Sequence, residues 1–181
     1  MGLFTKDIKS LDDLFLQALG EILYIERRIS KVLPGLITKT SDPLLTRELG
    51  AMLDANATHI ERVKEVFRLN GTPPKANECT AIDGIFTSAY ELNEEIEQAN
   101  VLDTAIAGAA QAVEAYSCVR YTTVIGWLQH LGKPECARLL RKNLIERQRA
   151  SDALCQLAER RLNVQACTSG LHHPIGLGLA G

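Results

Sequence analysis

The hydrophobic residues of this 181-residue chain recur every three or four positions through most of its length. This spacing places them on one face of a helix, and the strict alternation typical of a half-buried strand is absent. The pattern predicts four long helices and one shorter helix, over residues 10–33, 43–69, 81–98, 101–131 and 134–162.

Proline, glycine and asparagine separate these segments. Pro34-Gly35 is expected to end the first helix or to kink it sharply. Asp42 is the predicted N-cap of the second helix, and Pro43 occupies its first position. Short turns therefore join the helices within each pair, at Pro34-Gly35 and at Gly132-Lys133-Pro134, and a long connection joins the two pairs.

Two hairpins of long helices joined by one long connection are typical of ferritin-like folds. We therefore predict an all-α protein, a ferritin-like four-helix bundle whose long crossover contains a short extra helix. The bundle is expected to occupy residues 1–163. Residues 164–181 are rich in glycine and poor in charge, so we expect a flexible tail that is unstructured or loosely docked.

The composition is that of an ordinary soluble domain, with 46% hydrophobic and 23% charged residues. Twenty basic residues against 22 acidic ones give a net charge of -2, which does not indicate nucleic acid or an anionic membrane as a partner. No apolar run approaches the roughly 20 residues that span a bilayer, and the N-terminus lacks the apolar stretch of a signal peptide. We expect a cytoplasmic protein whose five cysteines stay reduced.

Potential metal ligands lie on the apolar stripes of all four long helices. They are Glu26, His59, Glu114 and Glu146. An unpaired charge is costly to bury, so carboxylates on an apolar face require a partner. His59 follows Glu26 by 33 residues and Glu146 follows Glu114 by 32, so hairpins of matched length would bring the four groups to a similar depth. This pattern predicts a metal site in the bundle core.

The set is smaller than a carboxylate-bridged dimetal site requires. Such sites take one glutamate from each of two helices and a Glu-x-x-His pair from each of the others. Here the second long helix offers Asn56-x-x-His59 and the fourth offers Glu146-x-x-Arg149. One carboxylate and one imidazole are missing.

Five blocks of the chain, in order, resemble the bacterial YciE/YciF stress-protein family over about residues 8–160. The blocks are LDDLFLQALGEILYIERRISKVLP, HIERVKEVFRLNG, CTAIDGIF, DTAIAGAAQAVEAY and LGKPECARLLRKNLIERQRASDAL. The resemblance implies a ferritin-like four-helix bundle, a homodimer and a dimetal site without an established reaction. It places the family's metal-type carboxylates on Glu26, Glu114 and Glu146.

The chain also departs from that family at the site. Asp54-Ala55-Asn56 stands where the family usually has Glu-Glu-Thr, Ser117 stands where a second acid commonly follows, and Glu146-Arg147 replaces a Glu-Glu pair. Three carboxylates supply a charge of -3, which suits one divalent ion better than two. The hypothesis is a partly degenerate site that holds iron or manganese weakly, or in which the guanidinium of Arg149 swings inward and replaces the metal charge.

Two functions remain open at this point. The first is a ferritin-like stress-response protein with a non-haem iron or manganese site, which could react with oxygen or peroxide. The second is a metal-free helical scaffold that binds itself or another protein. Whether the chain is an enzyme is undecided, but it lacks the GxSxG elbow and the glycine-rich phosphate loop of common hydrolases.

Overall fold

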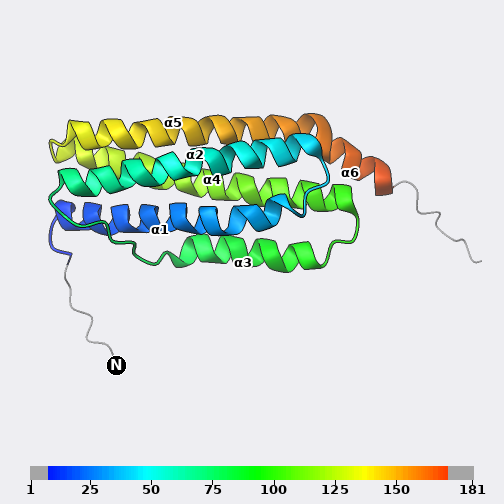
Figure 1. Cartoon of the computed structure of the whole chain (residues 1–181), viewed down its shortest axis with the longest axis horizontal. Coiled ribbons are helices and arrows are strands. Elements are labelled where there is room, and N and C mark those ends of the chain that lie inside the picture. The colour runs from blue at the N-terminus through cyan, green and yellow to red at the C-terminus, as the bar shows by residue number, and fades with distance from the viewer. Residues whose placement is uncertain (1–7, 171–181) are drawn as a thin grey trace, which may run out of the picture.

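A computed structural model describes residues 8–170, and every element within this range is helical (Figure 1). Four long helices lie side by side as a bundle, and α3 lies in the crossover between the two pairs. Helix α1 packs against α2 and α4, and α5 packs against the same two helices. The predicted four-helix bundle with a short extra helix is confirmed. The elements are α1 (Leu11–Ile37), α2 (Pro43–Leu69), α3 (Thr80–Glu94), α4 (Ala99–His130), α5 (Pro134–Leu157), the π-helical turn η1 (Ala158–Leu162) and α6 (Asn163–Gly170).

Local sequence signals set the starts and ends of the long helices. Asp42 is the N-cap of α2, as predicted, and its carboxylate accepts bonds from the backbone N–H groups of Leu44 at 2.8 Å and Leu45 at 3.2 Å. Helices α2 and α4 are each followed by a glycine with positive φ, Gly71 and Gly132, which glycine adopts without strain.

Pro34 does not end the first helix, which continues to Ile37. Of the two outcomes expected at Pro34, an end of the helix was wrong. Proline removes one backbone N–H donor, whereas the surrounding residues Leu33 and Leu36 are both buried in the core. The backbone N–H of Thr38 closes the last turn on the Pro34 carbonyl at 3.2 Å. Burial of two leucines thus outweighs the loss of one donor.

The apolar core consists of two clusters with a polar layer between them. One cluster takes residues 15–23 of α1 and 121–128 of α4, and the other takes residues 25–36 and 106–113 of the same helices. Where the two clusters meet, the helices bury charged or polar side chains. They are Glu26, Asn56, His59, Glu114, Ser117, Asn143 and Arg147. The bundle therefore carries one polar layer across its middle.

The last turns of the described chain are also helical. Residues 163–170 form α6, so part of the segment expected to be a tail is an ordered helix, and the side-chain amide of Asn100 donates to the Gln165 carbonyl at 2.7 Å. The remainder of the expected tail, residues 171–181, lies outside the described residues. Across residues 8–170, no helix is both long enough and apolar enough to pass through a membrane.

The crossover leaves α2 and lies against α1 at Gly20. The backbone N–H of Asn77 donates to the Gly20 carbonyl at 3.0 Å, and the Asn77 side chain donates to the Gln17 carbonyl at 3.1 Å. A Cβ atom at Gly20 would lie 2.3 Å from Asn77 Nδ2 and 2.9 Å from the Lys75 carbonyl oxygen. The absence of a side chain at Gly20 is thus what lets the crossover approach the bundle.

Gly20→Ala is therefore expected to lower the free energy of unfolding by about 1–3 kcal/mol, because the new methyl group displaces backbone of the crossover. Gly50→Ala in α2 is the matched control, since its Cβ would meet no atom within 4 Å. The control should be neutral or stabilising by up to about 1 kcal/mol. Urea titrations of the two variants measure both effects, and equal stabilities would contradict the proposed close approach.

Candidate functional site

Three of the four predicted ligands lie together in the polar layer. Glu26, His59 and Glu114 are 0%, 3% and 1% exposed, and they come from α1, α2 and α4. Glu146 of α5 differs, because its side chain is 36% exposed and lies at the edge of the layer. The apolar stripes of α1, α2 and α4 thus predicted the inward residues of those helices, but the stripe of α5 did not.

The inward charge of α5 is Arg147, and its side chain occupies the space between the two buried carboxylates. Nη1 donates to Glu114 Oε1 at 2.6 Å, Nη2 donates to Glu26 Oε2 at 2.5 Å, and Nε donates to Glu26 Oε1 at 3.1 Å. Arg147 is 3% exposed. One guanidinium therefore joins α1, α4 and α5 by charge-assisted hydrogen bonds.

The prediction that Arg149 turns inward was wrong, since this residue is exposed. The buried face of α5 contains Arg147 and not the adjacent Glu146, which was the predicted inward residue. It runs through Leu140, Asn143, Arg147 and Leu154. Each residue turns a helix by about 100°, so Arg149 lies on a different face from Arg147. The spacing of three, four and seven residues in this set is the signal that could have identified Arg147.

Glu26 already has a protein donor for every acceptor position of its carboxylate. Oε1 accepts from the Tyr121 hydroxyl at 2.7 Å and from Arg147 Nε, and Oε2 accepts from Asn56 Nδ2 and Arg147 Nη2. Asn56 is held in turn by the Ser30 hydroxyl, which donates to its side-chain oxygen. A carboxylate offers about four acceptor positions, so Glu26 has no free one.

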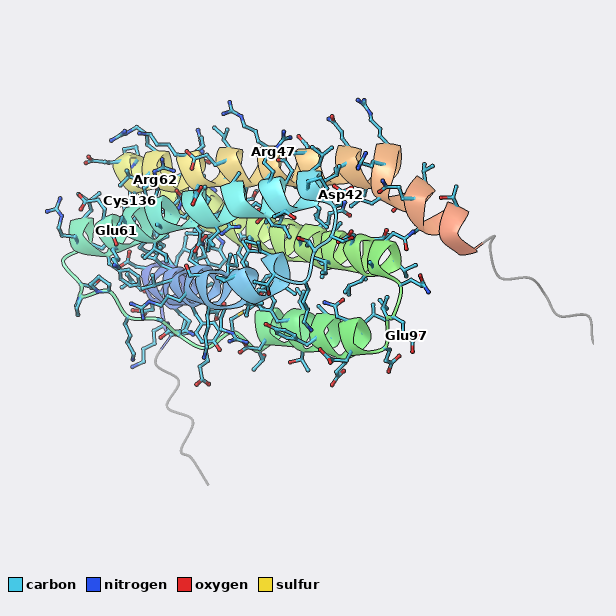
Figure 2. All side chains as sticks on the ribbon, turned by 45° about the vertical axis from the view of Figure 1, so that its right-hand side comes forward. Asp42, Arg47, Glu61, Arg62, Glu97 and Cys136 are labelled. Carbon is cyan, nitrogen blue, oxygen red and sulfur yellow. The ribbon has the colours of Figure 1, made fainter. Side chains whose placement is uncertain are left out.

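A second set of bonds joins the layer to its edge. Asn143 Nδ2 donates to the Tyr121 hydroxyl at 3.0 Å and to the His59 carbonyl at 3.1 Å. Arg62, labelled on α2 in Figure 2, donates from Nη1 to Asn143 Oδ1 at 2.9 Å and to Glu146 Oε2 at 2.7 Å. The Glu146 charge is thus compensated by Arg62 at the surface.

His59 lies between two carboxylates. Its Nε2 is 2.9 Å from Glu146 Oε2, within hydrogen-bond distance, whereas its Nδ1 is 3.7 Å from Glu26 Oε2. Nδ1 has no hydrogen-bond partner within residues 8–170, and the same holds for Glu114 Oε2. These two buried atoms are the unsatisfied part of the layer.

The two buried glutamates have opposite pKa shifts. Burial raises the pKa of Glu26, but the Arg147 guanidinium and His59 lower it by a larger amount. The net pKa is about 2, below the ordinary value of a glutamate. Burial also raises the pKa of Glu114, and there the single bond to Arg147 offsets only part of the rise. The charges of both glutamates raise the pKa of Arg147, which stays protonated. The Arg147–Glu26 pair is therefore ionised, and Glu114 is the residue that is easier to protonate.

These residues do not fit a dimetal centre. The acceptor positions of Glu26 are filled by protein donors, and the positive charge between Glu26 and Glu114 is the Arg147 guanidinium. In the part of the chain that the structure describes, no three His, Cys, Asp or Glu side chains are arranged to hold a metal ion. Two divalent cations would bring a charge of +4 beside a guanidinium that already neutralises one carboxylate.

Glu26→Gln should destabilise the bundle most near neutral pH. The folded pKa of about 2 lies below the roughly 4.3 of an unperturbed glutamate, so the ionised carboxylate stabilises the folded state above that unfolded value. This contribution is lost as pH falls toward 2. The difference in free energy of unfolding between wild type and variant should shrink by about 2 kcal/mol from pH 7 to pH 3, as measured by urea titration.

Glu114→Gln should show the opposite trend. The folded pKa of Glu114 is raised, so its contribution is present at low pH and is lost as pH rises through the folded pKa. Wild type should therefore lose stability relative to this variant as pH increases. Parallel pH profiles for wild type and both variants would contradict the assigned charge states.

Comparisons with known proteins agree with this architecture. The Escherichia coli K12 protein YciF is 29% identical over 161 residues, which is 88% of this chain and 97% of YciF. YcfI of Rhodopseudomonas palustris, described as "a putative structural protein", is 39% identical with a TM-score of 0.82 over 84% of this chain and 97% of its own.

The crystal structure of the E. coli stress protein YciF gives a TM-score of 0.81 over 86% of this chain and 99% of YciF. A Xanthomonas campestris protein at 14% identity, with a TM-score of 0.71 over 90% of this chain and 99% of its own, shares the fold. Residues 10–167 match the family model described as domain of unknown function DUF892. The chain therefore belongs to the DUF892 family and is a homologue of the stress protein YciF.

Proposed function

We propose that this protein is a structural member of the ferritin-like stress proteins, a helical scaffold whose core is held by Arg147 where related bundles hold metal ions. The observation that carries the proposal is the guanidinium between Glu26 and Glu114, bonded to both at 2.5–2.6 Å. A bundle of this class buries inward-facing carboxylates that require positive charge. Arg147 supplies that charge from within the chain.

Two further observations support a scaffold over a catalyst. Glu26 is surrounded by four donors, so binding an ion there requires at least one of those hydrogen bonds to break. Arg147 remains charged throughout the accessible pH range, so the charge cannot be removed by titration. YcfI, at 39% identity, is described as a structural protein, and YciF is described as a stress protein. Both descriptions agree with the proposed role.

The metal-site hypothesis from the sequence is weakly held iron or manganese at Glu26, His59, Glu114 and Glu146. The unpartnered atoms His59 Nδ1 and Glu114 Oε2 are what favour it. It requires Arg147 to leave the space between the two buried glutamates, because a guanidinium and a divalent cation repel one another there. The two proposals therefore differ in where the Arg147 side chain lies when metal is supplied.

Metal loading distinguishes them. The chain, purified without an affinity tag, incubated with Fe(II) or Mn(II) and desalted, is expected to retain no stoichiometric metal by mass spectrometry. A chelator should leave its melting temperature unchanged, and it should sediment as the same homodimer before and after the chelator. One or more ions retained per chain would contradict the scaffold proposal.

Arg147→Glu is the informative variant under the same loading. It removes the guanidinium and places a third carboxylate beside Glu26 and Glu114, so it should gain metal, or fold only when metal is present. Arg141→Glu is the matched control, because Arg141 lies on the exposed surface of the same helix. Equal metal contents in the two variants would show that Arg147 does not exclude the ion.

A further inference from the structure

The outer face of α4 differs from the outer faces of the other long helices. None of the Asp, Glu, Lys or Arg side chains of α4 is exposed. They are Asp103, Glu114 and Arg120. The surfaces of α1, α2 and α5, in contrast, carry exposed charges such as Lys31, Arg47 and Arg141. A helix without a charged outer face is typical of one that is covered on all sides, so the outer face of α4 needs a cover.

Six residues form a stripe along this uncharged face, which we call the α4 stripe. Its members are separated by four, three, four, three and four residues, the heptad spacing of helices that pack along one another. At 100° per residue, all six lie within about 40° of one line along the helix. Five of them are exposed, and the other, Ala105, is half-buried. The six are Val101, Ala105, Gly108, Ala112, Ala115 and Val119.

The α4 stripe borders an open groove of about 660 Å³, whose other wall is α3. Helix α3 lies outside the bundle of four long helices (Figure 1). It contributes Leu92 to the groove, and this side chain is 51% exposed. Because the middle of the stripe carries only glycine and alanine, the backbone of another helix can approach α4 closely.

The size of this face suits a dimer interface. The stripe spans 18 residues, or about 27 Å at 1.5 Å per residue. Together with α3 beside it, two helices of about 10 Å diameter present a flat area on the order of 500 Å². A standard stable interface buries about 800 Å² of accessible surface on each partner, which is of the same order.

The order of the residues in the α4 stripe favours a second copy of this chain as the partner. The stripe reads almost the same in both directions from its midpoint at residue 110, with glycine or alanine next to the midpoint, then alanine, then valine. In a two-fold dimer with antiparallel α4 helices, Val101 therefore faces Val119 of the partner subunit. A two-fold interface must be complementary to itself. The stripe meets this condition in size, and in charge because it carries none.

We propose that the α4 stripe is the surface through which two copies of this chain dimerise, with antiparallel α4 helices and a two-fold axis near the level of residue 110. A partner with a charged surface would lose the hydration of its charges against this face without gaining ion pairs. The proposal names the partner of the scaffold and rests on that proposed function. The two proposals fail in different measurements, because metal retention depends on Arg147 in the core whereas dimerisation depends on the α4 surface.

Sedimentation equilibrium of the full chain tests the proposal. Wild type should be a dimer, and Gly108→Glu should raise its dissociation constant at least about tenfold, because the two-fold axis brings the two new carboxylates close together in an apolar groove. A Cβ atom at Gly108 would meet no atom within 4 Å, so the variant should fold, and circular dichroism checks its helix content. Gly50→Glu in α2 is the matched control with equally open space, and it should leave the dissociation constant unchanged.

A mixture of two variants tests the antiparallel arrangement. Ala112→Lys alone should weaken the dimer for the same reason as Gly108→Glu. Mixed in equal amounts, the two variants should dimerise more tightly than either alone, because the introduced carboxylate of one chain faces the introduced ammonium group of the other. A mixture that dimerises no better than the separate variants would overturn the arrangement.

Two outcomes would overturn the interface itself. A wild-type chain that sediments as a monomer at every concentration would leave the α4 stripe to a different partner. A dimer that Gly108→Glu weakens no more than Gly50→Glu would place the interface on another face, and it would leave the scaffold function standing.

Discussion

The structure depends on how one positive charge is placed inside an aliphatic bundle. Glu26 and Glu114 lie in the interior at exposures of about 1% or less, where a lone carboxylate is strongly destabilising. The Arg147 guanidinium lies between them and bonds to both. Without that contact, two like charges would face each other in the middle of the core. Asn56 and Tyr121 donate to the same Glu26 carboxylate and extend this ion-pair cluster.

The cluster also connects the helices. Arg147 reaches from α5 to carboxylates on α1 and α4, and Asn56 of α2 donates to the same carboxylate of Glu26. The apolar stretches above and below the layer consist of aliphatic side chains that could pack in more than one register. Directional hydrogen bonds across the layer favour the register in which Arg147 meets both carboxylates, as a single buried asparagine fixes register in some coiled coils. A structural function for the whole bundle is consistent with this arrangement.

Most of the fold could be predicted from the sequence because the helical signals are local. The three-and-four spacing gave the helices, and Asp42-Pro43 gave the start of α2. The end of α1 could not be predicted in this way, because Pro34 signals a break locally whereas the burial of Leu33 and Leu36 is a tertiary effect. Three inward residues of the site were also predictable, since Glu26, His59 and Glu114 lie among clear apolar neighbours.

Helix α5, the last of the four long helices, shows why its contribution to the site was not predictable. Helix α5 is rich in charge, and two charged residues, Glu146 and Arg147, are adjacent at the level of the site. A shift of one residue turns the helix by about 100° and exchanges a negative ligand for a positive charge. Packing against α2 and α4 decides between them, and that packing is not encoded in the spacing of α5 alone. Whether residue 146 or residue 147 of α5 faces the core therefore decides between a metal site and an ion-pair cluster.

The most direct measurement is anomalous diffraction at the iron or manganese edge, from crystals grown with that metal. We expect continuous density for the Arg147 guanidinium between Glu26 and Glu114, and no anomalous peak there. An anomalous peak within about 2.5 Å of those carboxylate oxygens, with Arg147 turned away, would contradict it.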